Sequence, residues 1–536
     1  MRRRLLQAVL AACVVCGLSA APARAALETI VQDDAVLLYS GADQLDAATE
    51  RLKLLGVDQV RITANWSVIT RNASAAVKPA FDARDPAAYE QLRWAHLDNA
   101  VIAARAAGLS VLIDVGFWAP RWATTSPAGP KARENIKPGH YADFAVAVAR
   151  RYSGSWLLPA DTPNQPPPPP AQDENPFQDL LMPLFAPKPP PPPLPPAALA
   201  KPLPRVNVFA LWNEPNQPGL LLPQWRAGTK RPASPRVYRR MVRAAYPAIK
   251  KVRRNTRLLI GNTSSVGGNR GTGAMAPLEF LREFACVNRR LKRRAKSDCA
   301  NFKRLPGDGW AHHPYTRNLA PSARGPGPDD VQIADLPKLA RTLRALVRRG
   351  RLAKGYRSIE LTEFGYETKR VGPRPAVSQT RQARWLTWSE YLADRTPGVR
   401  SFAQFLLRDQ PPAPTPVSNS PNRAYGQYST GLLEADGEAK TAASTFRAGL
   451  FAGFARGERS VVLYGRLRLG PGKKVITIER RVRTRWRKIA RLQIAGQGSF
   501  TRRFVHRSGA IYRLTYPDGL GHRRTGLPVR PVRARR

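Results

Sequence analysis

The 536-residue sequence predicts an α/β fold, a (β/α)8 TIM barrel followed by a small C-terminal antiparallel β-sandwich. Between residues 27 and 450, short apolar runs typical of strands alternate with segments whose apolar residues have helical spacing. The alternation gives eight strands and eight helices, the number found in a closed parallel barrel. After residue 456 the apolar residues recur at every second position, as in antiparallel strands.

The elements of the predicted barrel follow one another in strict order. Gly56 ends the first helix, and Gly108 suits the C-terminal cap of the second. The predicted strands are 29–38, 57–64, 110–117, 205–212, 257–262, 309–313, 358–362 and 399–407. The predicted helices are 45–55, 89–107, 141–152, 237–252, 277–286, 336–349, 379–394 and 440–450. Together they assign residues 26–455 to one barrel domain.

A proline-rich insertion interrupts the barrel at residues 159–204. It holds nineteen prolines in 46 residues, and such runs favour an extended polyproline II conformation without a core. Because barrels tolerate surface excursions between a helix and the next strand, we interpret it as a loop. A ligand for a proline-binding module is the alternative.

The C-terminal residues 456–536 form a separate, strongly basic region. Predicted strands lie at 461–464, 475–478, 486–494, 500–505 and 510–516, with glycine-rich turns between them. This stretch carries 23 Lys or Arg against three acids, a net charge of about +20. We expect an immunoglobulin-like β-sandwich that acts as an accessory domain.

The N-terminal residues 1–25 resemble a secretory signal peptide. Three arginines after Met1 precede an apolar run to about residue 20 and then Ala23-Arg24-Ala25, a small-residue cleavage site. Cys13 also lies in a possible lipoprotein signal box, which is the alternative. No later stretch has about twenty apolar residues without charges, so we expect no transmembrane segment and a secreted protein.

Two cysteines remain after removal of the signal peptide. Cys286 and Cys299 are thirteen positions apart, and in an oxidising compartment they are expected to form a disulfide. A metal pair is the alternative, although no histidine lies at ligand spacing from either cysteine.

The formal net charge of +49 raises the question of nucleic-acid binding, because Lys and Arg neutralise phosphates. The charge is spread along the entire chain, however, and many arginines lie on helix faces where they can be solvated. We therefore expect no specific nucleic-acid partner, and we expect adhesion to acidic cell-envelope polymers through the basic C-terminal region.

Two glutamates end predicted strands of the barrel. Glu214 follows strand 205–212 within Asn213-Glu214-Pro215, and Glu363 follows strand 358–362. Barrel active sites lie at the C-terminal ends of the strands, so these side chains are expected to face one pocket. Hydrolysis of a glycosidic bond with retention needs such a pair, one carboxylic acid that protonates the leaving oxygen and one carboxylate that attacks.

These motifs resemble those of glycoside hydrolase clan A, closest to the cellulase-type family 5, over residues 30 to 450 without the insertion. In that clan an Asn-Glu pair ends strand four and a lone Glu ends strand seven, which Asn213-Glu214 and Glu363 match. The resemblance implies that Glu214 is the general acid/base and Glu363 the nucleophile of a retaining enzyme. It also implies that Asn213 bonds the sugar 2-hydroxyl.

The same resemblance assigns further residues. Arg61, at the end of strand two, would hold Glu363 ionised, although it could instead be a salt-bridged core arginine. His313-Pro314-Tyr315 resembles the clan's His-x-Tyr, so Tyr315 would orient Glu363 and His313 would line the sugar site. The neighbouring His312 is expected to be structural.

Aromatic side chains near the strand ends are candidates for sugar stacking. Trp118 and Trp122 follow strand three, and the alternative for both is packing in the core. The clan places a tryptophan at the end of strand eight, whereas this chain has Phe405 in that region. Phe405 is the expected substitute, and the departure leaves the substrate class open.

The sequence thus predicts a glycosidase that hydrolyses O-glycosidic bonds of a β-linked oligo- or polysaccharide by double displacement, without cofactor or metal. No phosphate-binding loop, zinc motif or nucleophile elbow competes with this assignment. The alternatives are a non-catalytic glycan- or envelope-binding protein on the same barrel, and a basic nucleic-acid-binding surface protein.

Overall fold

The fold is that of a computed structural model, which describes residues 26–125, 133–158, 202–295, 297–370, 374–411, 428–518 and 520–533. The predicted signal peptide and residues 159–201 of the proline-rich insertion lie outside the described residues.

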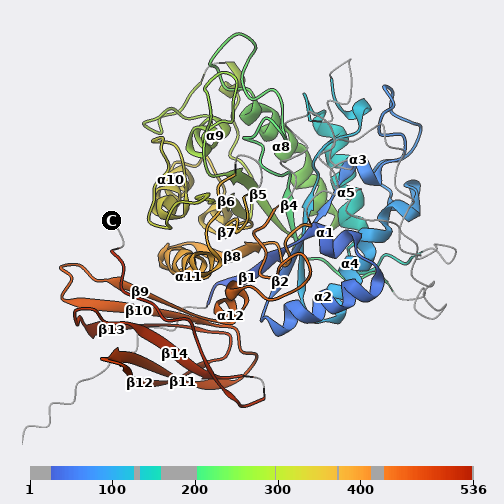
Figure 1. Ribbon diagram of the computed structural model, residues 1–536. Helices are drawn as coiled ribbons and strands as arrows, with labels where there is room; N and C mark the ends of the chain where they lie inside the picture. Colours follow the sequence, from blue (N-terminus) through green and yellow to red (C-terminus); the bar gives the residue numbers. More distant parts are fainter. Residues whose placement is uncertain are drawn as a thin grey trace, which may run out of the picture.

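A closed barrel of eight parallel strands forms the N-terminal part of the chain, as predicted (Figure 1). Each strand pairs with the next, and β1 pairs with β8 through Glu28–Ser401 to Gln32–Phe405 to close the barrel. The strands are β1 (Glu28–Gln32), β2 (Gln59–Ala64), β3 (Ser110–Val115), β4 (Val208–Leu211), β5 (Arg257–Ser264), β6 (Gly309–His313), β7 (Ile359–Leu361) and β8 (Val399–Phe405).

Helices surround this barrel and bury an apolar layer against it. They are α1 (Asp34–Tyr39), α2 (Ala42–Leu54), α3 (Trp66–Ile69), α4 (Ala95–Ala106), α5 (Pro138–Arg151), α8 (Ser234–Val252), α9 (Pro277–Phe284), α10 (Leu336–Arg348), α11 (Gln379–Arg395) and α12 (Thr441–Arg447). The core is therefore continuous from the strands to the inner faces of the helices.

The first predicted strand is too long by six residues, because β1 ends at Gln32 where 29–38 was expected. The carboxylate of Asp33 accepts a hydrogen bond from the Val36 backbone N–H at 3.1 Å and so caps α1. Side-chain capping of this kind starts a helix and takes the chain out of the sheet.

The last predicted helix also ends early. The prediction ran to Leu450, but α12 stops at Arg447 and Ala448–Phe454 forms strand β9. Gly449 and Gly453 weaken a helix there, and the segment instead pairs antiparallel with β10 (Ser460–Leu467). The C-terminal sheets thus begin before the predicted boundary at residue 456.

Two antiparallel sheets complete the chain, in strand orders β13-β10-β9 and β12-β11-β14-β15. Their apolar faces share one core, which confirms the predicted sandwich. The remaining strands are β11 (Lys473–Val482), β12 (Arg485–Ala495), β13 (Ser499–Val505), β14 (Tyr512–Pro517) and β15 (Arg523–Thr525). β15 was not predicted, and its three residues, all exposed, carry no periodicity.

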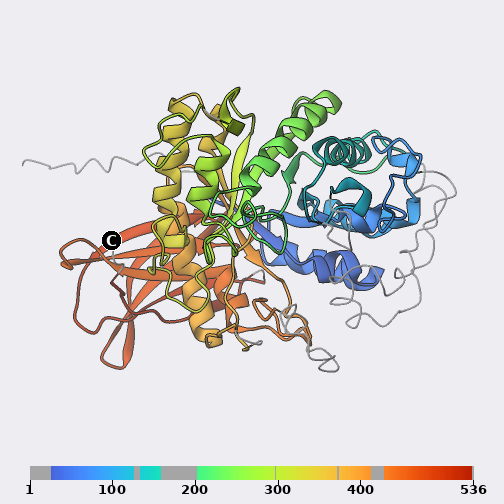
Figure 2. The ribbon, with the colours of Figure 1, turned by 90° about the horizontal axis from the view of Figure 1, so that it is seen from above.

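The C-terminal sheets lie against the barrel (Figure 2). Buried charges join the two parts of the molecule beside α11. Arg466 and Arg468 both contact Glu390 of α11, at 3.2 and 2.5 Å. Arg466 also donates to the Leu27 carbonyl at 2.9 Å, and Arg468 donates to the Thr29 hydroxyl at 2.9 Å. Glu390, Arg466 and Arg468 are called the interface cluster below.

The predicted disulfide is present, with Cys286 and Cys299 bonded and their Cα atoms 5.6 Å apart. Among the described residues, we find no helix with the length and apolar character needed to span a bilayer.

Candidate active site

Glu214 and Glu363 lie just beyond the C-terminal ends of β4 and β7, as the sequence predicts. The backbone after β4 turns sharply, because Trp212 and Glu214 have left-handed φ angles of 67° and 36°. Asn262, near the end of β5, holds this turn: its side-chain amide donates to the Trp212 carbonyl at 2.8 Å, and its backbone carbonyl accepts from the Glu214 N–H at 3.0 Å. Strain of this kind concentrates at functional sites, where surrounding contacts fix it.

Glu363 receives two donors, one on each carboxylate oxygen. Arg61 Nη1 lies 2.6 Å from Oε1, and the Tyr315 hydroxyl donates to Oε2 at 3.1 Å. The Glu363 side chain is 11% exposed, so these charge-assisted bonds act where water screens little. The carboxylate is therefore fixed in orientation, with its negative charge compensated.

Arg61 connects Glu363 to three other strand ends. Its guanidinium lies 2.7 Å from the Asp114 carboxylate, donates to Asn213 Oδ1 at 3.0 Å and donates to the Gln32 side chain. The side chain is fully buried, as expected of a core arginine, and yet it contacts the predicted nucleophile directly. Arg61, Asp114 and Glu363 are called the site cluster below.

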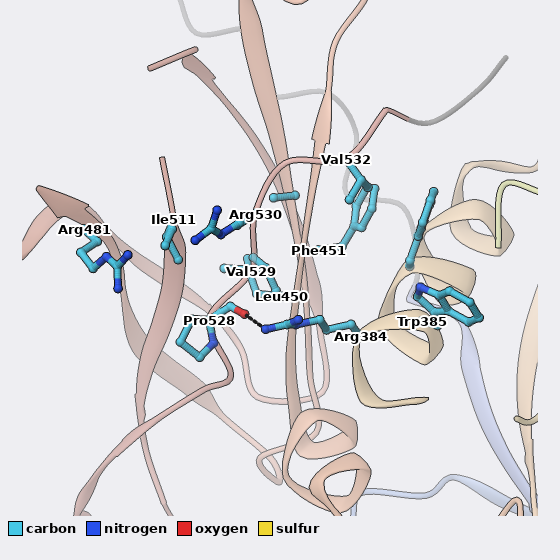
Figure 3. A pocket seen from close by; sticks show the side chains of 12 residues that line it. Arg384, Trp385, Leu450, Phe451, Arg481, Ile511, Pro528, Val529, Arg530 and Val532 are labelled. Atoms are coloured by element: carbon cyan, nitrogen blue, oxygen red, sulfur yellow. Dashed lines mark hydrogen bonds between the residues drawn. The ribbon is translucent and has the colours of Figure 1, made fainter. Parts of the chain in front are cut away.

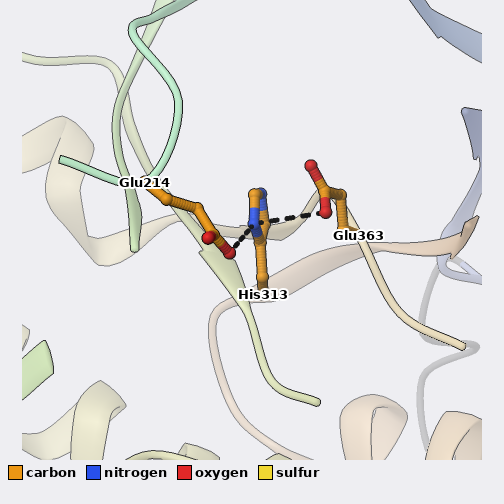
Figure 4. A group of neighbouring side chains, drawn as sticks. All are labelled: Glu214, His313 and Glu363. Carbon is orange, nitrogen blue, oxygen red and sulfur yellow. Dashed lines mark hydrogen bonds and ion pairs between the residues drawn. The ribbon is translucent and has the colours of Figure 1, made fainter. Parts of the chain in front are cut away.

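His313, the last residue of β6, lies between the two glutamates (Figure 4). Its Nδ1 is 2.9 Å from Glu214 Oε1 and 3.5 Å from Glu363 Oε2. One oxygen of each glutamate and one nitrogen of His313 all lie within 4.8 Å of one another. The structure thus brings the two predicted catalytic carboxyl groups into one site.

A chain of buried hydrogen bonds fixes the tautomer of His313. The Thr362 hydroxyl donates to Asn262 Oδ1 at 3.1 Å, so it must accept the bond from His313 Nε2 at 3.1 Å. Nε2 therefore carries a hydrogen, and Nδ1 faces Glu214 Oε1 at 2.9 Å. Glu214 and His313 share one proton in this arrangement, which suits a proton donor at Glu214.

The two glutamates have opposite pKa shifts because their surroundings differ. Burial raises the pKa of Glu214 above its ordinary value, the contact with His313 lowers it in part, and the nearby charge of Glu363 raises it. Burial alone would raise the pKa of Glu363 too, but His313, Arg61 and the Tyr315 hydroxyl together hold it below its ordinary value. When two neighbouring carboxyl groups have different pKa values, they are suited to different roles, one as an acid and one as an ionised base or nucleophile.

His312 is structural, as expected. Its ring is buried between the Thr263 hydroxyl and the Val331 carbonyl, at 2.9 and 2.8 Å. Burial lowers the pKa of His312 to about 3, so the ring is neutral near pH 7.

The aromatic candidates separate into two groups. Trp122 is 1% exposed and packs against Trp66 and Phe81, so its assignment to the sugar site is corrected to the core. Trp118 is 9% exposed and donates through its indole nitrogen to the Gly219 carbonyl at 3.2 Å; its contact with sugar stays a prediction. Phe405 is half-buried and its ring meets the edge of Tyr315, which places it beside Glu363.

Sequence reasoning missed several buried residues of the site. Asp114 had a usable signal, since it is the one carboxylate within the apolar strand 110–115. Asn262, Thr362 and Gln32 are ordinary polar residues at strand ends and carry no such signal. Tyr428 follows residues 412–427, which are outside the described part of the chain. The centroids of the Tyr428 and Phe405 rings are 5.1 Å apart.

Glu214, His313 and Glu363 are also the described group whose spacing would suit a metal ion. A cation there would lie close to the guanidinium of Arg61, 2.6 Å from Glu363, and both oxygens of Glu363 already accept hydrogen bonds, from Arg61 and Tyr315. The donor set therefore favours proton transfer and nucleophilic chemistry over metal binding.

Glycosidases are among the solved structures that are similar to this chain. No protein-family model matches the chain, and no curated protein matches it in sequence. A glucosidase from Croceicoccus marinus is 13% identical, with 91% of this chain and 94% of that chain covered and a TM-score of 0.45. GH5_18 from Streptomyces cattleya, in complex with GlcNAc, is 15% identical, with 78% of each chain covered and a TM-score of 0.41.

A GH30 endoxylanase from Clostridium papyrosolvens is 11% identical, with 90% of this chain and 94% of that chain covered and a TM-score of 0.40. At such low identities the function has to be argued from the site itself.

Proposed function

We propose that the protein is a retaining glycoside hydrolase that cleaves O-glycosidic bonds of a β-linked glycan by double displacement. One observation carries the proposal: two carboxyl groups of unlike environment meet at the carboxyl ends of β4 and β7, with one oxygen of each within 4.8 Å. Retaining enzymes hold their carboxyl groups about 5 to 5.5 Å apart, whereas inverting enzymes leave about 6.5 to 9.5 Å for a water molecule.

The first displacement follows from the two environments. Glu363, kept ionised by Arg61 and Tyr315, attacks the anomeric carbon while Glu214 gives its proton to the leaving oxygen. The carbon–oxygen bond of the glycoside breaks, and an ester bond to Glu363 forms. The raised pKa of Glu214 keeps its proton available for this step.

The second displacement reverses these roles. Glu214, now ionised, takes a proton from water, and the water oxygen attacks the anomeric carbon of the glycosyl ester. Glu363 leaves as a carboxylate, and the sugar is released with its original configuration. Because esterification removes the negative charge of Glu363, one of the causes that raise the pKa of Glu214 is lost at this stage.

Asn213 and Phe405 are suited to hold the sugar. Asn213 Oδ1 accepts from Arg61, which leaves its amide hydrogens to donate to a sugar hydroxyl such as the 2-hydroxyl. Phe405 offers a half-buried apolar ring beside Tyr315, against which the C–H face of a sugar can pack.

We also propose that the protein is secreted and that its basic C-terminal sheets bind acidic cell-envelope polymers. The N-terminal sequence pattern and the Cys286–Cys299 disulfide support export, since disulfides persist in oxidising compartments. The net charge of about +20 over residues 456–536 supports adhesion to polyanions.

The proposed mechanism is tested by replacing the acid/base. In Glu214→Gln, glycosides with poor leaving groups should lose most of their rate, whereas glycosylation by activated aryl glycosides should be largely spared. Azide needs no general base, so it should restore turnover and give a β-glycosyl azide, whose configuration is read by NMR. A product of inverted configuration, or wild-type rates without azide, would contradict the assignment of both glutamates.

A further inference from the structure

A cavity lies between α11 and the C-terminal sheets, lined by none of the residues of the candidate active site (Figure 3). Its volume is about 330 Å³, within the range of small-ligand pockets. Arg384 and Trp385 contribute from α11, while Arg481 and Arg530 contribute from the C-terminal part of the chain. The cavity therefore exists only where the barrel and the sandwich meet.

The arginines around this cavity lack a counter-charge. Arg384, Arg481 and Arg530 are exposed, and within the described parts of the chain none of them forms an ion pair with a carboxylate. Arg384 is held in place by a hydrogen bond of 3.1 Å to the Pro528 carbonyl. Three guanidinium groups without a carboxylate partner around one cavity favour the binding of an anion.

The acids of the C-terminal region are all engaged elsewhere, which explains the imbalance. Its three carboxylates are Glu458, Glu479 and Asp518. Glu458 pairs with Arg533, Glu479 with Arg513 and Arg523, and Asp518 with Arg524. On the barrel side, Glu390 of α11 is taken by the interface cluster. An external anion is thus the available partner for the arginines of the cavity.

The walls of the cavity are apolar and aromatic. Trp388 and Phe451 stack with centroids 5.5 Å apart, and Trp385 is half-buried beside them. The Trp388 indole N–H is buried without an acceptor among the described residues, so a donor is also present in the wall. Such walls suit a ring with an apolar face, and a hydrated inorganic anion would gain nothing from them.

We propose that this cavity binds a carboxylated sugar, that is, a uronic-acid residue of an acidic glycan. The guanidinium group of arginine can donate two parallel hydrogen bonds to the two oxygens of a carboxylate. The tryptophans provide an apolar surface for the pyranose ring. A cavity of about 330 Å³ is suited to a sugar unit and too small to enclose nucleic-acid helices. The inference rests on the proposed function in that the site would keep an acidic glycan near the barrel, but its binding can be measured without turnover.

The experiment compares two triple variants of the full chain that remove the same charge. Arg384→Gln/Arg481→Gln/Arg530→Gln empties the cavity of its cations. Arg485→Gln/Arg487→Gln/Arg491→Gln removes three exposed arginines of β12, outside the cavity. Short oligogalacturonate and oligoglucuronate are titrated calorimetrically at fixed ionic strength, with methyl-esterified oligogalacturonate as the uncharged probe of the same ring.

Affinity of at least one acidic oligosaccharide should fall on the order of tenfold in the cavity variant, because charge-assisted bonds are lost, and by less than about twofold in the β12 variant. The esterified probe should bind the wild-type protein as weakly as the acidic oligosaccharide binds the cavity variant. Trp385→Ala should weaken the acidic sugar, and Trp385→Phe should restore part of the affinity. Melting temperatures of all variants check the fold.

Three results would overturn the inference. The first is that neither acidic probe binds the wild-type protein. The second is that the two triple variants lose affinity equally, which would indicate that total charge alone decides binding. Tighter binding of single-stranded DNA with the same dependence on the cavity arginines would assign the cavity to nucleic acid. Failure of the Glu214→Gln azide test leaves all of these readouts unchanged, so the two proposals fail separately.

Discussion

Two buried arginine clusters in this molecule have opposite charge balance. In the site cluster, one guanidinium, Arg61, faces two carboxylates, Asp114 at 2.7 Å and Glu363 at 2.6 Å. In the interface cluster, two guanidiniums face one carboxylate, Glu390. The same residue types therefore serve chemistry in one place and assembly in the other.

The balance of charge explains the difference. Excess negative charge in the site raises the cost of ionising every acid at once, and burial raises the pKa of Asp114 to about 7 even beside Arg61. The site can therefore keep Glu363 ionised while the raised pKa values of Asp114 and Glu214 favour their protonated forms. In the interface cluster burial lowers the pKa of Arg468, and the carboxylate of Glu390, the counter-charge of both guanidiniums, acts in the opposite direction.

The largest expected effect is on activity, in Glu363→Gln. Loss of the proposed nucleophile should lower kcat for every glycoside by roughly 10⁴-fold or more, since the proposed covalent step cannot occur. The free energy of unfolding should change little, because Arg61 keeps Asp114 as its partner. Initial rates and urea melts of the same preparation check both statements. If Glu363→Gln lost stability as well as activity, the site cluster would not differ from the interface cluster in the way proposed.

The same substitution in the interface cluster, Glu390→Gln, should act the other way round. Two buried guanidiniums lose their carboxylate, which typically costs about 3 to 5 kcal/mol. The rate per folded molecule on a small aryl glycoside should stay near that of the wild type. Replacing all three residues, Glu390→Leu/Arg466→Met/Arg468→Met, should recover much of the stability, since no uncompensated charge remains. If Glu390→Gln melts like the wild type, the cluster does not stabilise the junction.

A smaller effect is expected from Thr362→Val, which cuts the hydrogen-bond chain behind His313. The Nε2–H of His313 would lose its buried acceptor, a loss of about 1 to 3 kcal/mol, and the ring would no longer be held with Nδ1 facing Glu214. For glycosides with poor leaving groups kcat/KM should fall on the order of tenfold, with KM nearly unchanged. Thr362→Ser keeps the hydroxyl and should restore the rate; failure of this rescue would point to packing instead.

The smallest expected effect is on the pH profile. In the proposed mechanism the reaction requires Glu363 ionised and Glu214 protonated, so kcat/KM should fall at low pH as Glu363 gains a proton and at high pH as Glu214 loses one. The lowered pKa of Glu363 and the raised pKa of Glu214 widen this window on both sides. Tyr315→Phe removes one donor to Glu363, so its acid limb should move to higher pH by about one unit. An acid limb that stays in place would remove Tyr315 from the set that holds the nucleophile.

The order of the barrel elements could be predicted because periodicity is a local property. Each strand and helix buries its own apolar face, so the pattern is written into consecutive residues. The errors fall where another signal competes. At Asp33 a capping carboxylate ends β1 early, and at Ala448 an apolar segment after α12 pairs with β10. Short apolar runs of this kind are ambiguous between helix and strand until their partner is known.

The candidate site was predictable to the extent that its residues end strands in recognisable pairs. Asn213, Glu214 and Glu363 stand in such motifs, and the structure brings them together. Trp122 follows a strand as well but lies against Trp66 and Phe81, so position alone could not separate a sugar-binding ring from a core ring.

By itself the sequence determined the succession of strands and helices, the change to period two near the C-terminus, and the pair of glutamates at strand ends. Apart from the Arg61–Glu363 contact, which the resemblance to clan A implied, only the tertiary structure decided how the buried charges pair. Arg61 and Glu363 are 302 residues apart and meet because the barrel closes, while Arg466 reaches the Leu27 carbonyl across 439 residues because the sandwich packs against the barrel. Charge interactions depend on distance and burial, and neither quantity is a property of neighbouring residues in the chain.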